Sequence, residues 1–148
     1  MPKEMYIGFV RCSFTLCIYN KKPLFTSEEI VQLFNRILKE ELQKQNIINW
    51  AYIYMPDHLH LVVEGTSDNS DLLKAINIFK QRTGYWLLKN MNPFRWQKNY
   101  YDYIHHKDED LKKHIYYIFN NPVRKGMIEN WEDYHFKGSL DFEINDIM

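Results

Sequence analysis

The chain has 148 residues, with 19 basic and 19 acidic side chains and a formal net charge of zero. This length suits one domain with a real core and leaves little room for two. The balanced charge excludes any argument for nucleic-acid binding from a high isoelectric point. Because no run of about twenty apolar residues is present, we expect a soluble, cytoplasmic protein without a membrane span. We expect one domain over residues 1–148, with an acidic tail that frays from about residue 137.

The first half of the chain predicts a strand, a helix and a strand pair. Residues 6–19 are rich in β-branched and aromatic side chains and are typical of a strand. Thr26 and Glu29 form a capping box for a helix that continues to about residue 45. Residues 49–55 and 58–64 follow as two strands, joined by a Pro-Asp turn. Cysteines at an odd spacing in the first strand face opposite sides, so we expect no disulfide.

The second half predicts two helices separated by a strand. The polar loop at residues 66–70 caps a helix that runs from about residue 72 to 89. The aromatic segment at residues 95–106 is strand-like, and Asp108 caps a third helix that must end near Pro122. The order strand, helix, strand, strand, helix, strand, helix indicates a ferredoxin-like (RRM-like) α+β fold. We expect an antiparallel sheet with helices packed on one face and a functional C-terminal helix.

The segment "MPDHLHLVV" carries the most informative pattern. His58 and His60 are two residues apart in a strand, so both point to one face while Leu59 and Leu61 point to the other. Two imidazoles on one face suit a divalent transition metal, but two ligands do not complete a site. A third ligand must come from elsewhere in the fold. The alternative is a solvated pair of histidines without a metal.

The third helix offers two equivalent sources of a hydroxyl and an amide. Tyr117 and Asn121 are one turn apart, and Tyr116 and Asn120 have the same spacing. Both pairs lie beside the apolar stripe of the helix. Helical periodicity therefore leaves the choice between the two pairs open.

The combination of "MPDHLHLVV" with "HIYYIFNNPVRKG" some sixty residues later resembles the HUH single-tyrosine transposases, in particular the REP-associated tyrosine transposase branch. The likeness extends over about residues 6–135 and includes "WQKNYYDYIHHKDEDL". It implies that His58 and His60 bind the metal, that Asn121 is the third ligand, and that Tyr117 is the nucleophile. The resemblance, and not helical geometry, selects Tyr117 over Tyr116.

The resemblance also implies an activity. Members of this family cleave and rejoin single-stranded or hairpin DNA with Mg²⁺ or Mn²⁺, through a covalent 5′-phosphotyrosine intermediate. The chain would then be a DNA endonuclease and strand transferase, acting as a monomer or homodimer without a membrane partner. Candidate DNA contacts are the basic and aromatic residues Lys80, Arg82, Arg95, Trp96, Lys98 and Arg124.

Two other functions stay open at this point. A catalytically inactive ferredoxin-like module would bind nucleic acid without forming a covalent adduct. A small metal-dependent hydrolase would use the two histidines with water, and its turnover would survive the change Tyr117→Phe.

Overall fold

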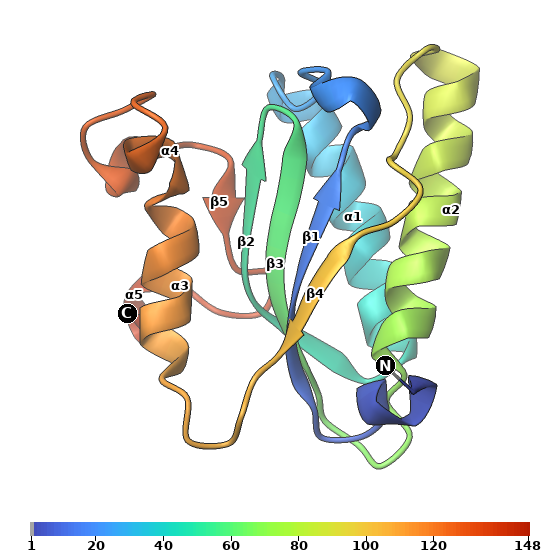
Figure 1. Cartoon of the computed structure of the whole chain (residues 1–148), viewed down its shortest axis with the longest axis vertical. Coiled ribbons are helices and arrows are strands. Elements are labelled where there is room, and N and C mark those ends of the chain that lie inside the picture. Colours follow the sequence, from blue (N-terminus) through green and yellow to red (C-terminus); the bar gives the residue numbers. More distant parts are fainter. Residues whose placement is uncertain (1) are drawn as a thin grey trace.

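The computed structural model describes residues 2–148, which form a five-stranded sheet with helices on both faces (Figure 1). In chain order the main elements are β1 (Arg11–Cys17), α1 (Glu28–Lys44), β2 (Ile47–Met55), β3 (His58–Gly65), α2 (Leu72–Asn90), β4 (Tyr101–Ile104), α3 (Leu111–Phe119), α4 (Asn121–Arg124), β5 (Lys137–Gly138) and α5 (Ile144–Ile147). The strand order is β4-β1-β3-β2-β5, and each neighbouring pair is antiparallel. The expected ferredoxin-like α+β fold is confirmed.

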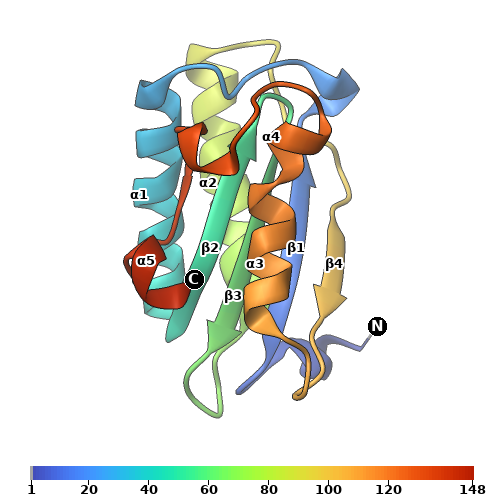
Figure 2. The ribbon, with the colours of Figure 1, turned by 90° about the vertical axis from the view of Figure 1, so that its left-hand side faces the viewer.

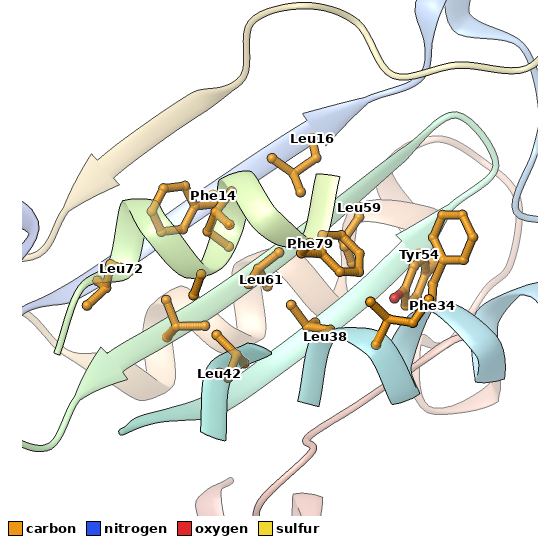
Figure 3. Packing of buried hydrophobic residues seen from close by; sticks show 14 of the residues in the cluster. Phe14, Leu16, Phe34, Leu38, Leu42, Tyr54, Leu59, Leu61, Leu72 and Phe79 are labelled. Atoms are coloured by element: carbon orange, nitrogen blue, oxygen red, sulfur yellow. The ribbon is translucent and has the colours of Figure 1, made fainter. Parts of the chain in front are cut away.

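The two faces of the sheet are covered differently. The crossover helices α1 and α2 pack together on one face, as expected, and α3 crosses the opposite face (Figure 2). The larger core fills the space between the sheet and α1 and α2, with Phe14, Phe34, Leu61 and Phe79 among its members (Figure 3). A smaller core lies between α3 and the side of the sheet formed by β2 and β3. The sheet is thus enclosed by apolar layers that differ in extent.

Strict alternation along β1 and β3 decides which side chains reach each face. In β1, the even-numbered residues from Cys12 to Leu16 are buried in the larger core, and the odd-numbered residues point toward α3. In β3, Leu59 and Leu61 are buried in the same core. Polar residues at the intervening positions therefore gather on the α3 face.

The helices begin at capping residues close to the predicted ones. Ser27, and not Thr26, caps α1 by accepting a hydrogen bond from the backbone of Ile30. Asp110, and not Asp108, caps α3. Neighbouring residues with equal capping ability were available in each case, so local preference could not select one. None of the helices in residues 2–148 combines the length and apolarity needed to cross a bilayer.

The acidic tail is ordered, which corrects the expectation that it frays from about residue 137. Its first residues pair with β2 as the edge strand β5. Asp141 accepts a hydrogen bond of 2.7 Å from the backbone N–H of Asn49, whose side-chain oxygen accepts one of 3.0 Å from Leu140 N–H. Ile147 of α5 is buried in the smaller core. The tail therefore completes the layer that supports α3.

Candidate metal and tyrosine site

His58 and His60 lie on the face of the sheet that α3 crosses. In the strand register His60 pairs with Thr15 of β1, and His58 lies at the end of β3 next to the hairpin turn. The centroids of the two rings are 4.9 Å apart, and the ring planes are nearly perpendicular at 84°. The strand thus holds two imidazoles close enough to share one ligand.

One nitrogen of each imidazole is fixed by a neighbour. Asp57 Oδ1 lies 2.7 Å from His58 Nδ1, and Thr15 Oγ1 lies 2.8 Å from His60 Nδ1. Because a carboxylate can only accept a hydrogen bond, Nδ1 carries the hydrogen and His58 has its lone pair at Nε2. Burial, with contributions from His58 and Arg124, lowers the pKa of His60 to about 4. The His60 ring is therefore neutral at physiological pH, which is the form that binds metals.

Asn121 reaches the histidine pair from the junction between α3 and α4. Its side chain is buried, and its Nδ2 lies 3.2 Å from His58 Nε2. Pro122 follows in the first turn of α4, where its missing N–H removes no helical hydrogen bond. The helix therefore breaks between α3 and α4 just before Pro122, and Asn121 lies at this break with its side chain toward His58.

The three side chains fit a divalent cation. A half-turn of the Asn121 amide exchanges its nitrogen and oxygen, so a carbonyl oxygen can occupy the point now 3.2 Å from His58 Nε2. Adjacent ligands of an octahedral ion with bonds of about 2.1 Å are separated by about 3.0 Å, which agrees with that spacing. Two imidazole nitrogens and one amide oxygen would leave coordination positions open for a substrate.

Tyr117 shares a cleft with His60, whereas Tyr116 does not. The cleft has a volume of about 230 Å³, and both Tyr117 and His60 line it. The Tyr117 side chain is 63% exposed, so its hydroxyl is available to a large substrate. Arg124 lies over its ring, with the guanidinium carbon 3.8 Å from the ring centroid. This position distinguishes the two tyrosines that helical spacing left equivalent.

The cleft also contains polar and aromatic residues that sequence reasoning missed. Its sheet side presents Ser13 and Thr15 of β1 together with Tyr101 and Tyr103 of β4. Tyr101 and Tyr103 are 66% and 49% exposed. Their two-residue spacing was a signal that both face one side, and pairing of β4 with β1 places that side under α3.

A second group of titratable residues, His105, Glu109 and His114, lies at the start of α3. His114 Nε2 is 2.8 Å from Glu109 Oε2, and the hydroxyl of Tyr103 donates to Glu109 Oε1 at 2.6 Å. Both nitrogens of His105 already have protein partners, since Arg11 Nε donates to Nδ1 and Nε2 lies 2.6 Å from Ser13 Oγ.

The rings of His105 and His114 are tilted at 34° to each other, with centroids 4.1 Å apart. One ligand atom from each of the three residues lies within 4.8 Å of the others, but the Arg11 guanidinium is adjacent to His105 and both His105 nitrogens already have partners. This geometry fits a hydrogen-bonded connection between α3 and the sheet better than a metal site.

Three of the predicted DNA contacts are engaged in the fold. Lys80 donates to the carbonyls of Gln97 and Lys98, and Arg82 forms ion pairs with acidic residues of α1. The indole N–H of Trp96 donates to Thr83 Oγ1 at 2.8 Å, and its ring packs against the larger core. The Trp96 ring is half-buried by these contacts, and its role as a stacking surface stays a prediction.

The other three predicted contacts have exposed side chains. Arg95 lies over the ring of Tyr19, with its guanidinium carbon 4.0 Å from the centroid. Lys98 is exposed, and only its backbone carbonyl is used. Arg124 is the one that lies beside the candidate site, through its contact with Tyr117.

A ferredoxin-like sheet with a histidine pair beneath a tyrosine-bearing helix defines the class of tyrosine transposases. Residues 10–121 match the family described as "Transposase IS200 like". The chain belongs to this family.

Individual relatives agree with the family. The REP-associated tyrosine transposase of Escherichia coli (strain K12) is 28% identical over 137 residues, which cover 90% of this chain and 79% of the relative. A relative from Haemophilus influenzae is 22% identical over 134 residues, covering 83% and 76%. A solved structure of a REP-associated tyrosine transposase bound to a REP hairpin has a TM-score of 0.75 and 20% identity, and the match covers 89% of this chain and 78% of that one. This last likeness shows that the fold is shared.

Proposed function

We propose that this transposase is a metal-dependent single-stranded DNA endonuclease and strand transferase that forms a covalent 5′-phosphotyrosine intermediate. The observation that carries the proposal is that side chains of the helical layer lie beside the histidines of β3. Asn121 from the helical layer contacts His58, and Tyr117 from the same layer lines a cleft with His60. A nucleophile and three potential ligands of a cation thus meet at one place.

The reaction assigned to Tyr117 is attack of its phenolic oxygen on the phosphorus of a DNA phosphodiester. The new bond joins phosphorus to the tyrosine oxygen, the bond from phosphorus to the 3′-oxygen breaks, and the 3′-oxygen leaves as a hydroxyl. Attack by a 3′-hydroxyl on the phosphotyrosine reverses the step and joins strands, so no external energy source is needed. A bound Mg²⁺ or Mn²⁺ would offset the charge that develops on the phosphate oxygens.

The surrounding side chains have supporting roles in this scheme. Asp57 and Thr15 contact Nδ1 of the two imidazoles, so each Nε2 is the atom that would bind the cation. The Arg124 guanidinium lies over the Tyr117 ring, where it would attract the phosphate. The exposed Tyr101 and Tyr103 rings offer surfaces on which bases can stack.

The proposed substrate is single-stranded or hairpin DNA. The structural neighbour was solved bound to a REP hairpin, which supports this class of partner for the present chain. All the residues assigned to the reaction come from one chain, so a single copy supplies a complete site. This supports action as a monomer.

A covalent-adduct assay tests the proposal. The protein is incubated with Mn²⁺ and a panel of single-stranded and hairpin oligonucleotides, and adducts that survive denaturant are counted. We expect an adduct with the natural chain and with Tyr116→Phe, and none with Tyr117→Phe. Tyr116 is the matched control because it is the adjacent exposed tyrosine on the same helix.

Other outcomes would contradict the proposal in identifiable ways. DNA binding without an adduct in any condition would indicate a binding module. Cleavage that persists in Tyr117→Phe would indicate hydrolysis by water. An adduct lost in Tyr116→Phe and kept in Tyr117→Phe would overturn the assignment of the nucleophile.

A further inference from the structure

Helix α3 lies on the outside of the molecule on its face of the sheet (Figure 2), and its side chains border a second hollow. We call it the outer groove; it has a volume of about 440 Å³ and includes Lys112, Lys113, Tyr116, Tyr117 and Arg124. Tyr117 also lines the cleft that contains His60. The outer groove and the candidate active site therefore meet at the proposed nucleophile.

The cations of the outer groove have no acidic partners. Within residues 2–148, no carboxylate forms an ion pair with Lys112, Lys113 or Arg124. The two lysines occupy the first turn of α3, which contains no acidic residue. Positive charge at this end opposes the helix dipole and costs stability, so these residues break a local rule of helix design. Such a departure is expected where a surface binds an anion.

The groove also presents aromatic rings beside these charges. Tyr116 and Tyr117 are 53% and 63% exposed, although tyrosine rings of this size are usually more covered in a folded domain. The Tyr116 ring is supported by Trp131, with centroids 6.4 Å apart. Exposed rings that alternate with unpaired cations match the bases and phosphates of a single strand.

We propose that the outer groove binds the single-stranded DNA that continues from the phosphate held at Tyr117. In this arrangement Tyr116 stacks on a base, and Lys112 and Lys113 contact phosphates. Lys112 and Tyr117 are five positions apart within α3, which at a helical rise of 1.5 Å corresponds to about 8 Å along the helix axis. This inference rests on the proposed function, because it needs a DNA strand at Tyr117.

The test measures DNA binding in the Tyr117→Phe chain, which keeps the ring and cannot form an adduct. The probes are a DNA hairpin without an extension and the same hairpin with an oligodeoxythymidine extension at its foot. Variants Tyr116→Ala and the double change Lys112→Glu with Lys113→Glu are compared with a matched pair on α2. There Lys89 Nζ lies 5.5 Å from the ring centroid of the exposed Tyr85, and the controls are Tyr85→Ala and Lys89→Glu.

We expect Tyr116→Ala to weaken binding of the extended hairpin about tenfold. The double lysine variant should also reduce the slope of log affinity against log salt by about 1.4, since each single-strand phosphate contact contributes about 0.7. Binding of the hairpin without an extension and the behaviour of both α2 controls should be unchanged.

Each contrary result has a distinct meaning. If Tyr117→Phe binds neither probe, the proposed function itself fails. If both probes bind and the groove variants change neither affinity, the function stands and the groove inference is overturned. Equal loss for both probes would assign the groove to the hairpin stem, and a change in sedimentation mass in the groove variants would assign it to a protein interface. Either of these results overturns the inference.

Discussion

Replacement of Asp57 tests whether His58 is prepared to hold a metal. Asp57 Oδ1 accepts a hydrogen bond of 2.7 Å from His58 Nδ1 and orients Nε2 toward Asn121. Loss of such a partner typically weakens metal binding by about 10- to 100-fold, which corresponds to about 1.4 to 2.7 kcal/mol. We therefore expect the Asp57→Ala variant to bind Mn²⁺ with an affinity about 10- to 100-fold lower than that of the natural chain. Asp57→Asn keeps an acceptor and a turn-forming side chain, so its loss should be below about tenfold.

Calorimetric titration of the full chain with Mn²⁺ measures this effect directly, and urea unfolding monitors the fold. Asp68→Ala is the matched control, because Asp68 is an exposed acid in another loop. His58→Ala sets the level expected for loss of a ligand. The reasoning is wrong if Asp57→Ala binds Mn²⁺ as tightly as the natural chain while His58→Ala does not.

Three further changes test the fold around the site. Arg82→Ala should lower the free energy of unfolding by about 1 to 3 kcal/mol, because the Glu41 carboxylate, which is only 2% exposed, loses its arginine partner. DNA affinity, measured by fluorescence anisotropy, should not change. Asn49→Ala removes side-chain hydrogen bonds to two carbonyls and one N–H at the β2 bulge, so urea unfolding should show a loss of about 3 kcal/mol. Burial lowers the pKa of His105 from 6.5 to about 4. Between pH 4 and 6.5 the unfolded chain therefore binds more protons than the folded chain, so the free energy of unfolding should fall as the pH drops through this range. In His105→Gln the dependence of the melting temperature on pH over this window should be weaker, and an unchanged dependence would contradict the assignment. The charged and titratable groups that face His105 are Arg11, Glu109 and His114.

The fold could be predicted because its information is local. Alternation in β1 and β3 and the helical spacing in α1 and α2 determine which faces are apolar, and the element order then limits the topology. The same alternation placed His58 and His60 on one face. The predicted fourth strand covered residues 95–106, whereas β4 is only Tyr101–Ile104, and the sequence did not show which of its tyrosines face the cleft.

The choice of nucleophile illustrates what local patterns leave undetermined. Tyr116 and Tyr117 are equivalent by helical spacing, and only family resemblance separated them at the sequence level. The structure adds that Tyr117 faces the cleft with His60, because the apolar side of α3 fixes how the helix is rotated on the sheet. The rotation of α3 depends on its packing against residues distant in the sequence, so local patterns do not determine it.

Two of the predicted DNA contacts, Arg82 and Trp96, make contacts within the fold that sequence patterns did not indicate. Arg82 and Trp96 have the chemistry that nucleic acid requires, but their partners are distant in sequence. Arg82 forms ion pairs with residues of α1 more than forty positions away, and the indole N–H of Trp96 donates a hydrogen bond to Thr83 of α2. A basic or aromatic residue is available to DNA only if the fold has not already used it, and that condition cannot be evaluated from composition.

The acidic tail has a physical role in this arrangement. The apolar contacts of α3 are with β2, β3, α5 and Trp131, and none of the polar residues of β1 takes part. Ile147 of α5 and Trp131 pack on the same small core, and the Trp131 ring stacks on Phe119 of α3 with centroids 5.6 Å apart. The helix is therefore held over one half of the sheet, and the other half stays open as the cleft beneath Tyr117. By supporting α3 from the closed side, the tail leaves the cleft beside His60 open.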